Sequence, residues 1–243
     1  MRQTLVIDNG NSSTKIGVER DGEILAVRSY RRLTAQIAGA LLKEYGDFDA
    51  VASCSVGADI SPALDVLRQN VSKVLCVEGI TPVPVSLDGY KRPERLGPDR
   101  IAALCGAYAE MPGKEILVAD YGTAITYDLL LSNGTFAGGN IAPGTGMRMR
   151  ALHEHTARLP LINLDQPPML WGDDTDQAIL AGVLHGVAGE LCHYRRLISP
   201  DAEIIVTGGA SARVLPLLPF TVNHRPNLVL TGLKSILDYN ENN

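Results

Sequence analysis

The stretch TLVIDNGNSSTKIGV, residues 4–18, joins an apolar strand to a short polar loop and a second strand. The loop region holds one carboxylate, Asp8, one glycine, Gly10, and one lysine, Lys15, beside small polar side chains. A glycine lets backbone N–H groups approach an anion closely, and a hydroxyl such as that of Ser12 can donate a hydrogen bond to it. Because a carboxylate repels phosphate unless a cation intervenes, the loop predicts phosphate held through a metal ion. An ordinary tight turn with polar caps is the alternative for a single loop of this kind.

The same pattern returns in EILVADYGTAITYDLLLSNGTFAGG, residues 115–139. Asp8 corresponds to Asp120 and Gly10 to Gly122 at one common offset. Neither loop is a P-loop, because GxxxxGK[ST] is absent, and no GxGxxG follows a strand. Two matched loops favour paired phosphate sites over two unrelated turns.

Hairpin signals also match at that offset, namely Asp21-Gly22 and Asn133-Gly134. Such pairs suit type I′ turns, whose two central residues need positive φ. Each half is therefore expected to begin with strand, loop, strand, turn and strand. The apolar periodicity then predicts helices near 34–45, 61–70, 145–157, 175–197 and 231–240, strands at 49–56, 73–79 and 203–209, and a short helix after Ser211.

This repeated α/β order predicts two domains related by internal duplication, with ligands in a cleft between them. The boundary is expected at the Pro-Gly of MPGKE, residues 111–115, which gives domains of residues 1–113 and 114–243. Residues 161–174 contain adjacent prolines and few periodic features, so they are expected to form a surface loop.

The composition narrows the class of protein. The chain has 243 residues, of which 45% are hydrophobic and 20% charged, as in globular proteins. A net charge of -5 and only 5% aromatic residues argue against nucleic-acid binding. No apolar run approaches 18 residues, and the N-terminus leads straight into a strand, so a cytoplasmic protein that does not enter membranes is expected. The four cysteines form no CxxC pair and are expected to be reduced and mostly buried.

A third candidate segment, GYKRPERLGPDRIAALCGAY, occupies residues 89–108. Gly97, Pro98 and Asp99 precede a helical pattern, so Asp99 can be a carboxylate that the helix dipole favours. It can equally be a base beside Arg100, accepting a hydroxyl proton while the arginine binds an anionic group. The residue pattern leaves both interpretations open.

The glycines of GGNIAPGTGMRMRAL, residues 138–152, are expected to lead into a helix start. A helix N-terminus is a natural anion site, although the glycines can also serve close packing of sheet and helix. Arg148 and Arg150 are interpreted as solvated charge. His153 and His155 point to different helix faces and are expected at the surface.

Together these motifs resemble type III pantothenate kinases, members of the acetate kinase, sugar kinase, heat-shock and actin ATPase superfamily. The resemblance covers almost the whole chain and is carried by DNGNSSTK, YKRPERLGPDR, DYGTAITYD, GGNIAPG and HTARLP. It implies two actin-like ATPase domains of the ribonuclease H-like kind. It also implies ATP-dependent phosphorylation of pantothenate to 4'-phosphopantothenate, the first step of coenzyme A biosynthesis.

The resemblance places roles on matching residues. It implies that Asp8 holds Mg²⁺, that Asp120 helps bind a monovalent cation, K⁺ or NH₄⁺, and that Asp99 accepts the acceptor's proton. The implied ATP and phosphate contacts are Gly10, Asn11, Ser12, Lys15, Gly122 and Thr123. The implied pantothenate contacts are Tyr90, Gly97, Arg100 and Thr175.

The resemblance further implies a homodimer whose partner completes the acceptor pocket. The helical pattern QAILAGVLHGVAGELCHY, residues 177–194, agrees, because it carries more apolar residues than one buried face requires. A fully buried helix of a monomer is the alternative. Two other functions are weighed against pantothenate kinase, a sugar kinase of the same superfamily and a non-catalytic nucleotide-binding regulator. Asp99 disfavours the regulator, because nucleotide binding alone does not need that carboxylate.

Overall fold

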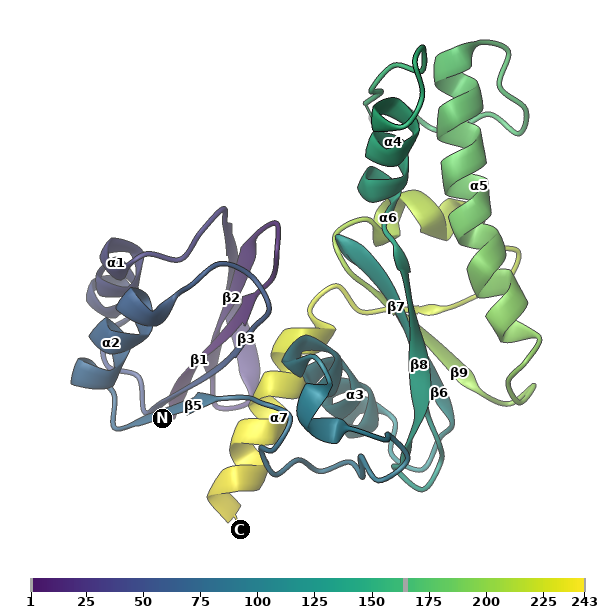
Figure 1. Cartoon of the computed structure of the whole chain (residues 1–243). Helices are drawn as coiled ribbons and strands as arrows, with labels where there is room; N and C mark the ends of the chain where they lie inside the picture. The colour runs from purple at the N-terminus through teal and green to yellow at the C-terminus, as the bar shows by residue number, and fades with distance from the viewer. Residues whose placement is uncertain (1, 164–165, 243) are drawn as a thin grey trace. The chain divides into compact units, whose positions relative to one another are not determined.

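The computed structural model describes residues 2–163 and 166–242 (Figure 1). Contacts divide these residues into two compact units. Unit 1 contains residues 2–113, 134–136 and 227–242, and unit 2 contains residues 114–133 and 137–226. The units change at the expected boundary between residues 113 and 114, but the last helix groups with unit 1. The two domains of residues 1–113 and 114–243 were inferred from the matched motifs, and they stay a prediction.

Unit 1 is built on a five-stranded sheet with the order β3-β2-β1-β4-β5. Its strands are β1 (Gln3–Asn9), β2 (Thr14–Arg20), β3 (Glu23–Tyr30), β4 (Ala50–Ser55) and β5 (Lys73–Cys76). The strands β1, β2 and β3 pair antiparallel, whereas β4 runs parallel to both β1 and β5. The strand, loop, strand, turn, strand order expected for the first half is confirmed.

The sheet of unit 1 lies between two helical layers (Figure 1). Its helices are α1 (Ala35–Tyr45), α2 (Ser61–Asn70), α3 (Pro98–Glu110) and α7 (Leu228–Asn242), with the 3₁₀ turn η1 (Pro93–Arg95). Leu5 and Ile7 of β1 pack into the core under α1 and α2. Val6 faces the other way, because successive side chains of a strand alternate. The helix α1 begins where the Thr34 side chain accepts a hydrogen bond from the Ile37 N–H.

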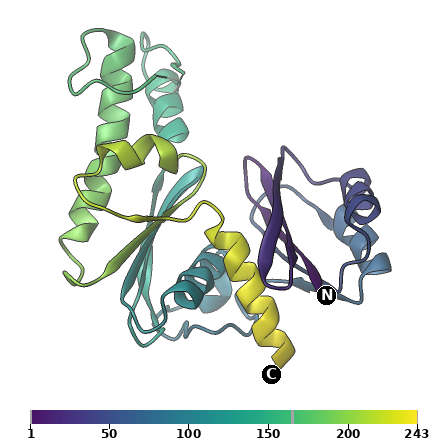
Figure 2. The same ribbon diagram turned by 180° about the vertical axis from the view of Figure 1, so that it is seen from behind.

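The helices α3 and α7 cross at two glycines, and Figure 2 shows the two helices side by side. A Cβ atom on Gly232 would overlap the carbonyl oxygen of Ala102 in α3. A Cβ atom on Gly106 would lie 2.5 Å from the carbonyl oxygen of Leu228 in α7. The two backbones therefore touch directly, at a separation that only glycine permits.

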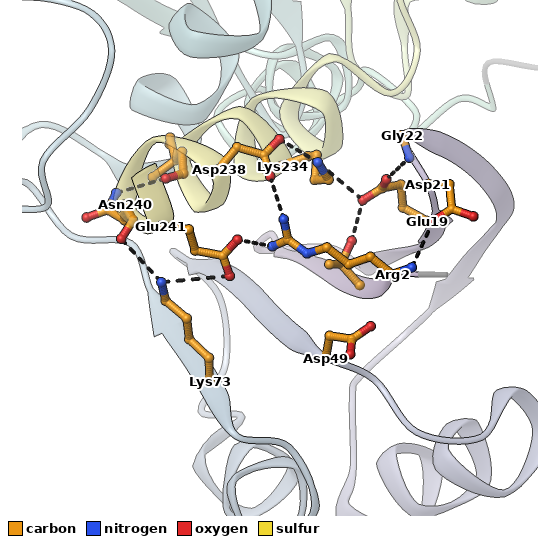
Figure 3. A network of polar contacts seen from close by, with 12 residues as sticks. Arg2, Glu19, Asp21, Gly22, Asp49, Lys73, Lys234, Asp238, Asn240 and Glu241 are labelled. Carbon is orange, nitrogen blue, oxygen red and sulfur yellow. Dashed lines mark hydrogen bonds and ion pairs between the residues drawn. The ribbon is translucent and has the colours of Figure 1, made fainter. Parts of the chain in front are cut away.

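A polar network holds the end of α7 against the start of β1 (Figure 3). The Arg2 guanidinium contacts the carboxylates of Asp238, at 3.3 Å, and Glu241. Lys73 at the start of β5 lies 3.8 Å from Glu241. Lys234 contacts Asp238 and lies 3.7 Å from the buried Glu19 carboxylate. Charged groups from β2, from β5 and from the residue before β1 thus contact α7, so this helix closes unit 1.

Unit 2 repeats the sheet of unit 1 with the order β10-β9-β6-β7-β8. Its strands are β6 (Ile116–Tyr121), β7 (Ala124–Leu130), β8 (Phe136–Pro143), β9 (Glu203–Thr207) and β10 (Asn223–His224), with Phe136 itself grouped in unit 1. The strands β6 and β7 pair antiparallel, β6 and β9 parallel, and β9 and β10 parallel, as the corresponding strands of unit 1 do. The internal duplication predicted from the matched motifs is confirmed in the strand order.

The helical elements of unit 2 are α4 (Thr145–Glu154), α5 (Thr175–Arg195), α6 (Ser211–Val214) and the 3₁₀ turn η2 (Leu215–Leu217). Val187 and Leu191 of α5 pack on Leu117 and Ala119 of β6. The helix α4 packs against the first half of α5, with Met149 and Leu180 in one small core. In Figure 1 this pair of helices projects from one end of the sheet of unit 2.

The two matched turns differ in detail. Asp21 has φ 51° and Gly22 φ 94°, so the first turn has the type I′ sign at both positions. In the second turn Gly134 has φ 80°, but Asn133 is not in the left-handed region, so type I′ geometry is wrong there. The second turn has a further role, because the Gly134 carbonyl accepts a hydrogen bond from the Ser86 N–H at 2.9 Å.

Other sequence predictions can be checked directly. No regular helix or strand forms between Glu154 and Thr175 in the described residues, as expected for the loop 161–174, of which residues 164 and 165 lie outside the described part. The four cysteines are free and buried or half-buried. Among the described residues, no helix is long and apolar enough to cross a membrane.

We expect Gly232→Ala to destabilise the protein by about 2 to 4 kcal/mol, because the added methyl forces α3 and α7 apart. The matched control is Gly39→Ala, since Gly39 lies within α1 and a Cβ atom there meets nothing within 4 Å. That control should gain about 0.5 to 1 kcal/mol from the better helix propensity of alanine. Urea unfolding of both variants measures the difference, and equal stability of the two would contradict the crossing described above.

Candidate active site

The Asp8 carboxylate sits at the end of β1, between Lys15 of β2 and Cys54 of β4 in the strand register. The Cys54 thiol donates a hydrogen bond to Asp8 Oδ1 at 3.7 Å. Burial and, to a smaller extent, the nearby charge of Asp99 raise the pKa of Asp8, Lys15 and the Cys54 hydrogen bond lower it, and the net pKa is about 6. Burial and the Asp99 charge thus disfavour the ionised form of Asp8, and a cation beside Asp8 would stabilise that form.

Asn9 organises the loop that follows Asp8, although no role was predicted for this residue. Its carbonyl accepts hydrogen bonds from the N–H groups of Val56 and Gly57 at 3.0 and 3.1 Å. Its side chain donates to Ser55 Oγ at 2.8 Å and accepts from Thr14 Oγ1 at 2.7 Å. These hydrogen bonds of Asn9 thus fix the loop to the end of β4. The only sequence signal for this residue was its place inside the DNGN motif.

The predicted phosphate contacts of the first loop lie together between β1 and β2. The Gly10 N–H donates to the Ser13 carbonyl at 3.1 Å, which closes the loop. A Cβ atom on Gly57 would overlap the Gly10 carbonyl, so the neighbouring chain packs directly on the loop. Asn11 and Ser12 are exposed and Lys15 is half-buried, which leaves this side of the loop accessible.

The start of α3 brings Asp99 to the same region of unit 1. Gly97 is the N-cap and Pro98 the first helical residue. The Asp99 carboxylate accepts a hydrogen bond from the Arg100 N–H at 2.9 Å, and its charge acts on Asp8. Asp99 is therefore a helix-start carboxylate, as one interpretation held, and its charge also acts on Asp8, while its role as a base stays a prediction.

The predicted acceptor contacts Tyr90 and Arg100 meet at one aromatic ring. The ring centre of Tyr90 lies 5.4 Å from that of Phe136, and the Arg100 guanidinium carbon lies 5.8 Å from the same ring. Phe136 belongs to β8 in the sequence but groups with unit 1 by contact. None of the motifs that carry the family resemblance includes Phe136, and no role was predicted for it.

A cavity of about 430 Å³ opens in unit 1 at the carboxyl ends of β4 and β5. In open α/β sheets this edge is where ligands bind. Its polar lining includes the following side chains: Ser53, Ser55, Cys76, Glu78, Glu94 and Arg95. The cavity also reaches Gly97 and Pro98, so it adjoins the start of α3.

The second predicted phosphate loop, which follows Asp120, is held by contacts within unit 2. Asp120 at the end of β6 pairs in register with Thr126 of β7 and Thr207 of β9. Gly208 has φ 90°, and a Cβ atom there would overlap Asp120 Oδ1. The segment TGGA, residues 207–210, which the sequence left as a generic turn, therefore lies directly against the Asp120 carboxylate. The Gly144 N–H donates to the Thr123 carbonyl at 3.1 Å, which ties the start of α4 to the same loop.

The remaining predicted residues fall elsewhere. Thr175 is exposed at the first position of α5 in unit 2, where the Asp174 side chain caps the helix by accepting from the Gln177 N–H at 2.7 Å. Arg148 is not simply solvated, because its guanidinium bonds Glu190 Oε1 at 2.6 Å and the Pro143 carbonyl at 2.7 Å. That expectation was wrong because α5 supplies a carboxylate that lies 42 residues away in sequence.

The histidines His153 and His155 are exposed, as expected. Within residues 2–163 and 166–242, no group of three or more histidine, cysteine, aspartate or glutamate side chains could enclose a metal ion. Proteins hold magnesium through one or two carboxylates together with substrate phosphates and water. The hard oxygen atoms of Asp8, in a region of surplus negative charge, fit such an open site.

The chain shares its fold with solved structures of other proteins. A chain assigned as a 2-dehydro-3-deoxygalactonokinase from Sinorhizobium meliloti matches with a TM-score of 0.60 at 15% identity, over 97% of this chain and 98% of that chain. At this identity the likeness concerns the fold. The duplicated sheets, each with an aspartate loop after its first strand, are those of the actin-like ATPase and sugar kinase fold.

Sequence comparison then defines the family. A family model described as type III pantothenate kinase matches residues 4–196. A type III pantothenate kinase of Porphyromonas gingivalis is 36% identical over 99% of this chain and 100% of its own length. One of Bacteroides fragilis is 35% identical over 97% of this chain and 98% of its own. The chain belongs to the type III pantothenate kinase family.

The pKa of Asp8 gives a testable effect on stability. A folded-state pKa of about 6 against 3.8 for the ordinary group means that folding disfavours the ionised form. The penalty is absent below about pH 4, grows between about pH 4 and pH 6, and is constant at higher pH. We therefore expect Asp8→Asn to be more stable than the wild type by about 3 kcal/mol at pH 7.5, with the gap closing toward pH 4. Thermal unfolding without metal or nucleotide measures this, and a variant less stable at pH 7.5 would contradict it.

Proposed function

We propose that this chain transfers the γ-phosphoryl group of ATP to the primary hydroxyl of pantothenate, giving 4'-phosphopantothenate and ADP. The reaction is the first step of coenzyme A biosynthesis. Family membership over nearly the whole chain supports the substrate pair. The observation that supports the proposed chemistry is the effect of the Asp99 charge on Asp8, since it is consistent with a proton acceptor near the proposed phosphate loop.

In the proposed reaction the pantothenate hydroxyl oxygen forms a bond to the γ-phosphorus, and the bond from that phosphorus to the bridging oxygen of ADP breaks. The hydroxyl proton passes to the Asp99 carboxylate. Tyr90, Gly97 and Arg100 hold the acceptor, and Arg100 suits its carboxylate because a guanidinium binds carboxylates in a bidentate manner. Thr175 is proposed as a further acceptor contact.

The nucleotide side is proposed on the two loops. Asp8 would hold Mg²⁺, and the ion would neutralise charge on the ATP phosphates. Around the phosphates we place the following residues: Gly10, Asn11, Ser12, Lys15, Gly122 and Thr123. Asp120 would help bind K⁺ or NH₄⁺ at the second loop. The fixed loop geometry described above supports this assignment, because a preorganised loop need not reorder when nucleotide binds.

We also propose a cytoplasmic homodimer. The apolar side chains of the loop before α5 support the dimer, since Leu170 and Trp171 are 72% and 82% exposed. Light scattering and an activity assay on one sample measure whether the active species is dimeric.

The function and the role of Asp99 are tested together. Purified protein with ATP should release ADP in a coupled assay when pantothenate is added, and not with hexoses or without an acceptor. Asp99→Asn should lower pantothenate-dependent turnover by roughly 10²-fold or more, because asparagine cannot take the proton. Its side-chain oxygen can still accept the hydrogen bond from the Arg100 N–H, so melting temperature and ATP affinity should change little.

The control is Asp65→Asn, which removes an exposed carboxylate from α2 and should leave turnover unchanged. ADP release with a hexose would point to a sugar kinase, and nucleotide binding with no acceptor turnover would point to a regulator. Near-normal turnover of Asp99→Asn at saturating pantothenate would leave Asp99 with a helix-start role alone.

We expect activity to require K⁺ or NH₄⁺ in addition to Mg²⁺, because Asp120 stands beside the second phosphate loop and lies against Gly208. Initial rates in sodium-only and potassium buffers measure the requirement. Asp120→Ala should abolish the response, whereas Asp201→Ala, an exposed carboxylate of the same unit, should keep it. Equal wild-type rates in the two buffers would rule out the cation site.

A further inference from the structure

We propose that Phe136 is a positioning residue for the acceptor, whose ring orients Tyr90 and Arg100 and thereby sets the affinity for an acidic substrate. This inference rests on the proposed function, because Tyr90 and Arg100 are acceptor contacts only within it. Phe136 itself is fully buried, so it acts through these neighbours and not by touching the substrate.

The contacts of the ring are of two kinds. The Tyr90 ring is tilted by 33° to it at a centroid distance of 5.4 Å, a favourable separation for an aromatic pair. The Arg100 guanidinium carbon lies 5.8 Å from the ring centre, within the range of a cation–π contact. Two side chains from different segments thus share one partner.

The contact with Arg100 matters because that side chain is only 7% exposed. A buried guanidinium has lost much of its hydration, and an aromatic face compensates part of that loss. Such a contact fixes the plane of the guanidinium in a way that suits bidentate binding of a carboxylate.

The backbone around Phe136 is itself fixed to the segment that carries Tyr90. The Phe136 N–H donates to the Ser86 carbonyl at 2.8 Å, and the Ser86 N–H donates to the Gly134 carbonyl at 2.9 Å. A Cβ atom on Gly89 would overlap the Phe136 carbonyl oxygen, so the chain just before Tyr90 packs directly on this backbone. Residues 134–136 and 86–90 therefore form one rigid patch.

Three segments converge on the ring, namely the 86–90 loop, the first turn of α3 and the turn that follows β7. Asp99 is adjacent to Arg100 on α3. The Phe136 ring therefore also helps to fix the pantothenate contacts relative to Asp99, the proposed proton acceptor. Its loss should loosen Arg100 and Tyr90 while leaving the loops that carry the proposed nucleotide contacts in place. The expected signature is weaker acceptor binding without weaker ATP binding.

The test compares Phe136→Leu, which keeps an apolar side chain but removes the ring, with Phe136→Tyr, which keeps the ring. We expect Phe136→Leu to raise the KM for pantothenate by about 5- to 20-fold, with the dissociation constant of ATP changed less than about twofold. Phe136→Tyr should restore the KM to within about threefold of wild type. Calorimetric titration of pantothenate and ATP, together with melting temperatures, provides the binding readout.

A matched control and a double-mutant cycle separate positioning from general stability. Tyr108 packs against the same turn, with its ring 3.0 Å from a Cβ atom built on Gly134, so Tyr108→Leu removes a neighbouring aromatic ring. It should lower the melting temperature without raising the KM for pantothenate. In an Arg100→Lys background, which lacks the planar guanidinium, Phe136→Leu should add less than about twofold to the KM, because both changes remove one interaction.

The outcomes distinguish this inference from the proposed function. No pantothenate-dependent ADP release by the wild type would overturn the proposed function itself. With that activity present, the inference on Phe136 is overturned by an unchanged KM in Phe136→Leu, by equal weakening of ATP and pantothenate binding, or by full additivity with Arg100→Lys. If Phe136→Leu fails to fold, Phe136→Tyr and Tyr108→Leu test the inference instead. A KM for pantothenate more than about threefold above wild type in Phe136→Tyr, or one raised by about 5-fold or more in Tyr108→Leu, would then overturn it.

Discussion

The close crossing of α3 and α7 is the constraint on which unit 1 depends. Two helices can touch backbone to backbone only where neither carries a side chain, and Gly106 and Gly232 meet that requirement. The crossing places α7 over β1 and β4 and fixes α3 beside it. Because Asp99 and Arg100 lie in the first turn of α3, the position of the candidate site follows from the contact at Gly106, about two turns further along the same helix.

The polar network at the end of α7 strengthens this arrangement. Arg2, Lys73 and Lys234 contact carboxylates on α7 and on β2, so the last residues of the chain are held to its first strand. Exposed ion pairs contribute little one at a time, but the buried Glu19 also accepts hydrogen bonds from Thr4 and from the Gly22 N–H. The network therefore links the hairpin turn at Asp21-Gly22 to the closing helix.

In the candidate site, by contrast, the charged groups lower the stability of the fold. Asp8 is desolvated and faces the charge of Asp99, so its ionised form costs stability in the absence of a cation. Equivalent positions of the two sheets differ in a related way, because β4 places the Cys54 thiol opposite Asp8 and β9 places the Thr207 hydroxyl opposite Asp120. The duplication thus preserved an aspartate and a neighbouring polar side chain while the chemistry of each neighbour changed.

The sequence by itself determined the elements, the duplication and the family. Apolar alternation, caps and turn residues act within a few positions, so the strands β1 and β6, the helix α1 and the hairpin after Asp21 could be predicted from it. The motifs likewise identified the aspartates of both loops. Only the tertiary structure decided what depends on partners distant in sequence: that α7 closes unit 1, that Asn9 organises the first loop, that Arg148 pairs with Glu190, and that Phe136 joins Tyr90 and Arg100. These contacts arise when separate elements pack, and local periodicity carries no information about which distant side chain will fill a given space.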